Sequence, residues 1–162
     1  MSDYYTEQLV KRKTPALANM GKIGLICLTA FSCYLVFMVP VAVILPVIMV
    51  VVDVFFFKRM DVEYEYLFVN GDLDIDKIMS KAKRKRVFAF NVNEMEILAP
   101  SGSAEMRLYQ NIKPSDYSSQ VPGHATYEMV VLKNGSKFRI IFEPNQVILD
   151  GMRMMAPRKV VL

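Results

Sequence analysis

Three carboxylates spaced two residues apart are the first residues in the chain that suggest a chemistry. Asp72, Asp74 and Asp76 alternate with apolar residues, which resembles the start of a calcium-binding EF-hand loop. That loop needs glycine at its sixth position and glutamate at its twelfth, and this chain has Lys77 and Lys83 there. The sequence therefore predicts no metal site. It predicts a strand whose carboxylates share one solvated face and pair with bases such as Lys83 on a neighbouring strand.

A basic cluster follows the acidic run and is the strongest candidate for a binding site. Its members are Lys81, Lys83, Arg84, Lys85 and Arg86. Near a membrane, each such charge attracts anionic lipid with about 1 kcal/mol. The alternative is that the cluster only balances the acidic strand, and it is favoured because residues 53–162 contain 16 basic and 14 acidic side chains. Nucleic acid is a disfavoured partner, since the acidic strand is adjacent and no aromatic-basic RNA motif is present.

Catalytic motifs are not found in the sequence. The single histidine, His124, follows a Pro-Gly pair, and the chain has no metalloprotease motif, phosphate loop, dinucleotide fingerprint or nucleophile elbow. Cys27 and Cys33 lie in an apolar stretch, so they cannot complete a cysteine–histidine pair or a zinc site. An enzyme that uses carboxylates alone stays conceivable, but no site for one is visible. We therefore expect a non-enzymatic protein without metal or cofactor.

An apolar block of 35 residues, from Ile23 to Phe57, dominates the chain, and Asp53 is its single charged residue. A secretory signal peptide fits poorly, because 22 mixed residues precede a block that far exceeds the usual hydrophobic region. A lipoprotein signal fits no better, since Phe31 replaces the small residue expected before Cys33. The block is therefore predicted to be a membrane segment of the mature protein.

The length of the apolar block favours two crossings of the membrane. One straight helix would reach roughly 50 Å, well beyond a hydrocarbon core of about 30 Å. A break near Val39–Pro40 leaves about 17 residues on each side, because Pro40 lacks a backbone N–H and biases Val39 away from helix. We expect two helices, at about 23–39 and 41–57. A single kinked span and a shallow re-entrant hairpin are the alternatives.

Basic residues flank the apolar block at both ends. Lys11, Arg12, Lys13 and Lys22 precede it, and Lys58 and Arg59 follow it. Positive charge is retained on the cytoplasmic side of membranes. The predicted location is therefore the cell membrane, with two spans and with both termini and the following domain in the cytoplasm.

Asp53 lies inside the apolar block but near its end. An acid within a span is often functional. Because Lys58 and Arg59 are only about a turn and a half away, the simpler interpretation is that Asp53 reaches the interface or pairs with them.

The segment before the block, residues 1–22, is predicted to be cytoplasmic or interfacial, with a short interfacial helix in the stretch SDYYTEQLVKRK. Tyr5 and Leu9 are four residues apart, with acidic residues early and basic residues late. We expect this segment to anchor the chain, and a protein-docking role is the alternative.

From Asp61 the pattern changes to the alternation typical of strands, and residues 61–156 are predicted to form a β domain. Asn70–Gly71 and Asn134–Gly135 predict tight hairpin turns, because primed turns need positive φ at both positions. Strands are expected at 63–68, 72–76, 86–92, 95–99, 126–132 and 137–142, a long loop at 100–123 with a short element at 104–109, a helix at 145–155 and a tail at 157–162.

The expected fold class is α+β: an N-terminal transmembrane helical hairpin, then a small antiparallel β barrel or sandwich of the pleckstrin-homology-like (PH-like) kind, closed by a C-terminal α-helix. A resemblance rests on the segments SDYYTEQLVKRK, EYEYLFVNGDLDIDKI with the following KAKRKR, MEILAP, and FEPNQVILDGMRMMAPRKVV. In these the chain resembles, over nearly its full length, a family of small membrane proteins of Gram-positive anaerobic bacteria with two N-terminal spans and a PH-like domain. The resemblance implies architecture and a cytoplasmic domain. It implies neither an activity nor phosphoinositide binding.

Two functional hypotheses follow. The first is a membrane-anchored scaffold or adaptor for a membrane or cytoplasmic protein, working through an exposed sheet edge, the 100–123 loop or the basic cluster. The second is a lipid-sensing module whose basic cluster reads anionic head groups of the bilayer.

Overall fold

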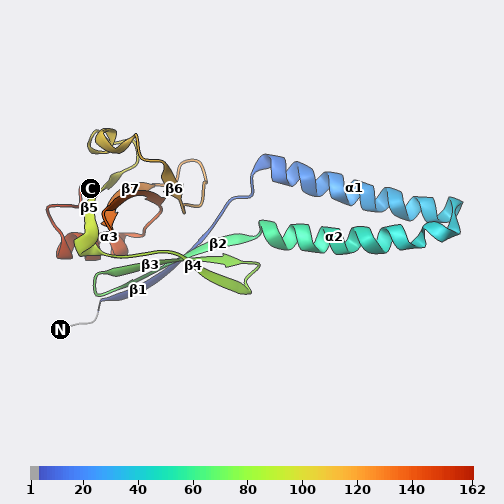
Figure 1. The fold of residues 1–162 in the computed structure, drawn as a ribbon, viewed down its shortest axis with the longest axis horizontal. Coiled ribbons are helices and arrows are strands. Elements are labelled where there is room, and N and C mark those ends of the chain that lie inside the picture. Colours follow the sequence, from blue (N-terminus) through green and yellow to red (C-terminus); the bar gives the residue numbers. More distant parts are fainter. Residues whose placement is uncertain (1–3) are drawn as a thin grey trace. The chain divides into compact units, whose positions relative to one another are not determined.

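The computed structural model describes residues 4–162, so the part of the predicted interfacial helix at residues 1–3 lies outside the described residues. The chain forms two compact units (Figure 1). The β unit contains residues 4–12, 63–78 and 84–162, and the helical unit contains residues 13–62 and 79–83.

The helical unit is a hairpin of two long helices, α1 (Ala16–Met38) and α2 (Ile44–Met60), joined by the short 3-10 helix η1 (Pro40–Val43). The break falls at Val39, which is extended at φ −136° and ψ 95°, as expected for a residue before proline. The two predicted helices are confirmed. Helix α1 has 23 residues and is longer than predicted, whereas α2 has 17 residues, as predicted, but begins and ends later in the sequence. By length and composition, Ala16–Met38 and Pro40–Met60 are sufficient to cross a membrane.

A polar contact joins the two helices. The Thr29 hydroxyl on α1 donates a hydrogen bond to Oδ2 of Asp53 on α2 at 2.6 Å. Asp53 is only 9% exposed and Ser32 of α1 only 6%, although most side chains of the hairpin point outward. The prediction that Asp53 reaches the interface or pairs with Lys58 and Arg59 is therefore wrong, because its carboxylate faces the other helix.

The first sheet of the β unit has the strand order β1-β2-β3-β4. Its strands are β1 (Tyr5–Lys11), β2 (Val62–Val69), β3 (Asp72–Met79) and β4 (Lys83–Asn91). The predicted Asn70–Gly71 turn between β2 and β3 is confirmed, with φ of 47° and 96°. Strand β1 pairs antiparallel with β2, from Tyr5 opposite Val69 to Lys11 opposite Glu63.

The interfacial helix predicted for the N-terminal segment is wrong for the described residues, because Tyr5–Lys11 form a strand. A spacing of four residues between Tyr5 and Leu9 fits a helix face, but it also fits the two-residue period of a strand. Both side chains point outward, at 61% and 59% exposure, whereas Val10 is 6% exposed. The hydrogen bonds with β2 stabilise this segment as a strand instead of a helix.

The second sheet has the order β5-β7-β8-β6. Its strands are β5 (Met95–Pro100), β6 (Pro114–Asp116), β7 (Tyr127–Lys133) and β8 (Ser136–Phe142). β7 pairs antiparallel with β5 and β8, across the predicted Asn134–Gly135 turn, whereas β6 pairs parallel with β8. The sheet is therefore mixed. Strand β6 was not predicted, because three residues beginning with proline are indistinguishable from the surrounding loop.

The core lies between the two sheets and the C-terminal helix α3 (Gln146–Met155). Tyr66 of β2 meets Phe142 of β8 edge-to-face, with ring centroids 5.7 Å apart. Its hydroxyl donates to the Tyr117 carbonyl oxygen at 2.6 Å, and burial raises the pKa of this phenol. The Asn145 side chain caps α3 by accepting a hydrogen bond from the Ile148 N–H at 2.9 Å. Fully buried core side chains include Phe68, Leu73, Ile75, Met129, Ile140, Ile148 and Met152.

The predicted α+β class is confirmed in its sandwich form, since the two sheets do not close into a barrel. The short element predicted at 104–109 is the 3-10 helix η3 (Glu105–Tyr109). Its Met106 packs with Ala99 and Val130 on the second sheet. The segment that connects β5 to β7 therefore packs on the second sheet through a small hydrophobic cluster.

Candidate functional site

The acidic run and the basic cluster meet in the first sheet. Arg84 lies 2.7 Å from Glu65 and 4.0 Å from Asp76, and Arg86 lies 2.8 Å from Asp74 and 3.5 Å from Asp76. The predicted cross-strand pairing is confirmed, and arginines rather than lysines provide it. Within residues 4–162, no group of three or more ligating side chains that could hold a metal ion is found.

The lysines of the basic cluster differ from its arginines. Lys81, Lys83 and Lys85 are exposed, and among residues 4–162 none of them has a carboxylate within ion-pair distance. On β4, Lys83 and Lys85 alternate with Arg84 and Arg86, so the two sets point to opposite faces. The cluster is thus divided into paired arginines and unpaired lysines.

Glu65 is the most deeply buried carboxylate of this sheet, at 4% exposure. Burial raises the pKa of its carboxyl group, and a hydrogen bond with Glu7 of β1 raises it further, whereas the charge of Arg84 lowers it. The Glu65 carboxyl group therefore keeps a proton to higher pH than an ordinary glutamate does.

The turn between β3 and β4 is held against the end of α2 within the helical unit. The backbone N–H of Ser80 donates to the Asp61 carbonyl oxygen at 2.9 Å, and the Ser80 hydroxyl donates to the Lys58 carbonyl oxygen. Ser80 and Lys81 both have φ of 54°, a left-handed conformation that residues other than glycine adopt at a cost. These contacts satisfy carbonyl groups that the last turn of a helix leaves without partners.

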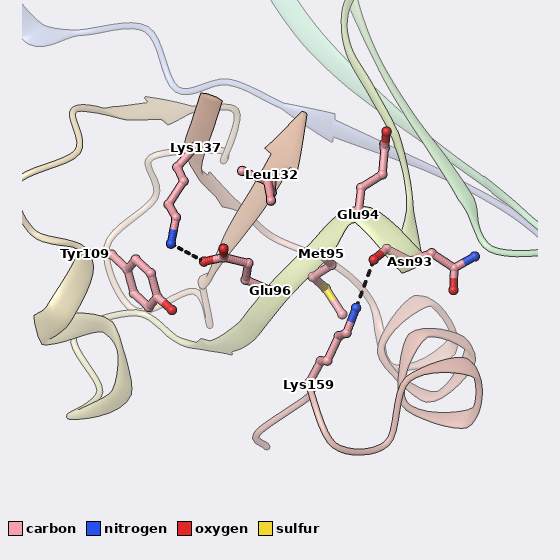
Figure 2. A pocket seen from close by; sticks show the side chains of 8 residues that line it. All are labelled: Asn93, Glu94, Met95, Glu96, Tyr109, Leu132, Lys137 and Lys159. Carbon is pink, nitrogen blue, oxygen red and sulfur yellow. Dashed lines mark hydrogen bonds and ion pairs between the residues drawn. The ribbon is translucent and has the colours of Figure 1, made fainter. Parts of the chain in front are cut away.

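A groove of about 620 Å³ opens on the second sheet beside η3. Its lining residues are Asn93, Glu94, Met95, Glu96, Tyr109, Leu132, Lys137 and Lys159 (Figure 2). Lys137 of β8 is 2.8 Å from Glu96 of β5, and its ammonium group lies over the Tyr109 ring at 5.4 Å. The hydrogen bond with Glu96 raises the pKa of Lys137.

The groove offers a mixed surface for recognition. On its other side, the Lys159 ammonium group donates to the Asn93 carbonyl oxygen at 2.9 Å. Leu132, which also lines the groove, is 43% exposed. The sequence did not predict this groove, because its residues come from five separate segments and only the 3-10 helix position gave a signal. Paired amines, carboxylates and an open apolar side chain suit the binding of a polypeptide segment.

Ser119, His124 and Glu143 lie close together in the loop before β7 and at the end of β8. The Ser119 hydroxyl is 3.3 Å from Nδ1 of His124, and Glu143 Oε1 is 2.6 Å from the same nitrogen. In a hydrolase triad, hydroxyl and carboxylate occupy opposite ring nitrogens. Here the Ser119 hydroxyl and the Glu143 carboxylate contact the same nitrogen of His124, so the histidine is not arranged to activate Ser119 as a nucleophile. We interpret these contacts as structural, because they join the loop to the end of β8.

The fold and its contacts define a class: a two-sheet β domain with a helical hairpin inserted between its first two strands and an open groove on its second sheet. The chain belongs to the family of bacterial PH-like domains (DUF6106), whose match covers residues 2–162. The expected PH-like architecture is thereby confirmed, and the Gram-positive anaerobic origin stays a prediction. Comparison with curated proteins and with solved structures gave no match.

Proposed function

We propose that this protein is a non-enzymatic membrane anchor that presents a cytoplasmic PH-like domain to a partner protein. The two apolar helices cross the membrane as a hairpin. The domain then works as an interaction module at the inner surface of the cell membrane, without cofactor or metal.

Strand pairing is the observation that carries this proposal. β1 precedes α1 and β2 follows α2, and Lys11 lies opposite Glu63 in the same sheet. Both ends of the helical segment are therefore tied to neighbouring positions of one folded sheet. A single crossing would place β1 and β2 on opposite sides of the bilayer, so the pairing favours an even number of crossings.

The charge distribution supports the cytoplasmic side for that sheet. Lys11, Arg12, Lys13 and Lys22 lie before or early in α1, and Lys58 and Arg59 occupy the last turn of α2. The η1 turn at the opposite end of the hairpin contains no charged residue. Positive flanks at one end and a neutral turn at the other match the rule for retention of the charged end inside.

The groove beside η3 is the surface that best suits a protein partner. The Leu132 side chain is exposed within the groove. Leu108 of η3, which precedes the groove residue Tyr109 in the sequence, is 84% exposed. Leu132 shares the groove with the ion pair of Lys137 and Glu96, a mixture of apolar and charged groups that is typical of transient interfaces. The second candidate function, sensing of anionic lipid, is supported by Lys81, Lys83 and Lys85, which have no carboxylate partner among the described residues.

Topology is the first test. In a chain with Cys27 and Cys33 replaced by alanine, single cysteines at Val41 and Ser136 probe the two sides, since both positions are exposed. We expect a membrane-impermeant maleimide added to whole cells to label position 41 alone. Labelling of position 136 from outside would reject the cytoplasmic domain, and release of the protein by alkaline carbonate would reject membrane insertion.

A photo-crosslinking amino acid tests the interaction surface. Placed at Leu132 in living cells, it should give a discrete protein adduct, whereas the exposed position Arg158 outside the groove should not. Equal adducts at both positions, or none at Leu132, would argue against docking at this groove.

A further inference from the structure

The end of α2 gathers cations that belong to different parts of the sequence. Lys58 and Arg59 lie in its last turn, and the docked β3–β4 turn brings Lys81 and Lys83 into the same compact unit. The hydrogen bonds from Ser80 to the Lys58 and Asp61 carbonyl groups hold that turn in place. Four basic side chains are thus fixed to one helix end, which we name the α2 collar.

The α2 collar has charge available for a ligand. All four side chains are exposed, and the guanidinium group of Arg59 lies 5.9 Å from the centre of the Phe55 ring. Within residues 4–162, no carboxylate lies within ion-pair distance of these four cations, whereas Arg84 and Arg86 are engaged with acids of the sheet. Asp61 is the acid nearest in sequence, and Lys22 of α1 sits over Phe57 at the same end of the hairpin.

We propose that the α2 collar binds the phosphate head groups of anionic phospholipids in the leaflet on the side of the β domain. This inference rests on the proposed membrane insertion, because it places the last turn of α2 at the head-group level. Lys81 has a positive φ, a conformation that favours glycine. The proposal gives a reason for lysine at this position, because Lys81 then brings a charge to the bilayer surface. The site uses only Lys81 and Lys83 of the basic cluster and adds two residues of the helix.

Four cations gathered at one helix end attract anionic lipid more strongly than scattered surface charges do. Each is worth about 1 kcal/mol near a surface rich in anionic lipid, which corresponds to about fivefold in local lipid preference per charge. The attraction decays within a Debye length of about 8 Å at physiological salt. Binding should therefore depend on salt and act close to Phe55, not at the far end of the hairpin.

The chain contains no tryptophan, so one introduced residue gives a fluorescence signal without background. In the full chain reconstituted in vesicles, Phe55→Trp reports on lipid at the α2 collar, and Phe37→Trp reports near the neutral turn, since both phenylalanines are largely exposed. Quenching by brominated phosphatidylglycerol, compared with brominated phosphatidylcholine, gives the relative affinity for anionic lipid at each position.

We expect Phe55→Trp to show a clear preference for phosphatidylglycerol that weakens with salt, and Phe37→Trp to show little. The double variant K81Q/K83Q should lower the preference at position 55 by on the order of tenfold or more. K113Q/R158Q removes the same charge from exposed residues of the β unit and should leave it unchanged.

Equal preference at positions 55 and 37, or an unchanged preference in K81Q/K83Q, would overturn the α2 collar while leaving membrane insertion intact. An effect of K113Q/R158Q as large as that of K81Q/K83Q would also overturn it, because the lipid preference would then depend on the net charge of the chain and not on the α2 collar. Absence of quenching by either brominated lipid would instead contradict membrane insertion itself.

Discussion

At the scale of single residues, the alternation of a strand decides which cations are available. Arg84 and Arg86 share the face of Asp74 and Asp76 and are bound to them, whereas Lys83 and Lys85 point away. Arginine is the residue better suited to the paired role, because its fork of donors matches a carboxylate. Lysine at the unpaired positions of an edge strand also discourages edge-to-edge association.

Glu65 gives a prediction about pH. Its pKa in the folded chain is raised above the ordinary value of 4.5, chiefly by burial and then by the hydrogen bond with Glu7. A raised pKa stabilises the fold while the group is protonated, and this contribution is lost as the pH rises through the folded pKa. The wild-type chain should therefore lose stability relative to Glu65→Gln as the pH increases above 4.5.

Denaturant unfolding of both chains between pH 4 and pH 8 measures this difference. Glu96→Gln is the matched control, because Glu96 is paired with Lys137 at the surface and is not buried. A difference between wild type and Glu65→Gln that is constant with pH would contradict the raised pKa of Glu65.

Gly151 gives a prediction about packing. A Cβ at this position of α3 would lie 2.6 Å from a ring carbon of Phe68 and would also meet the ring of Tyr4. Helix propensity alone would make Gly151→Ala stabilising by about 1 kcal/mol, but overpacking costs typically 1–3 kcal/mol. We expect a lower thermal unfolding midpoint for Gly151→Ala and none of this loss for Gly24→Ala, where a Cβ meets nothing within 4 Å. Equal midpoints would show that the rings yield.

At the scale of elements, long periodic segments were predictable and elements that depend on distant partners were not. The apolar hairpin, the break at Val39, both Asn-Gly turns and α3 follow from local signals and were predicted. Strand β1 was taken for a helix because its partner β2 lies more than fifty residues away in the sequence. Strand β6 was missed because only its place beside β8 makes it a strand.

The candidate sites follow the same rule. The basic cluster was visible as a run, but its division into paired and unpaired residues depends on strand alternation across three strands. Lys58 and Arg59 were interpreted as basic flanks of the apolar block and as partners of Asp53, since nothing local shows that Ser80 would dock on their helix end. The groove beside η3 needs five segments brought together, and of these only the position of the 3-10 helix gave a local signal.

The hairpin gives a prediction about helix association. The Thr29 hydroxyl contacts the buried carboxylate of Asp53, and Thr29→Val keeps the shape while removing this hydrogen bond. Hydrogen bonds between helices in membranes are worth about 0.6–1.7 kcal/mol, so the variant should unfold at a lower mole fraction of dodecyl sulfate in mixed micelles. Thr29→Ser keeps the hydroxyl and should stay close to wild type. Equal losses in both variants would assign the effect to packing.

At the scale of the whole molecule, the helical hairpin is an insertion between the paired strands β1 and β2. Gln8 of β1 donates to the Glu143 carbonyl oxygen at 2.8 Å and accepts from the Asn145 N–H at 2.7 Å, so the strand before the helices also fixes the start of α3. The N-terminal strand is therefore part of the β unit, which the chain completes only after it has passed through both helices.

This architecture predicts that the domain folds without its hairpin but not without β1. Replacing residues 13–61 by an Asn-Gly pair would join β1 to β2 through a two-residue turn that matches their antiparallel register. We expect a soluble, cooperatively unfolding domain. A chain of residues 62–162 alone should be less stable by at least about 3 kcal/mol, because it loses the burial of Val10 and both hydrogen bonds of Gln8. Equal denaturant midpoints for the two chains would mean that β1 is dispensable, and the strand pairing that supports two membrane crossings would lose its force.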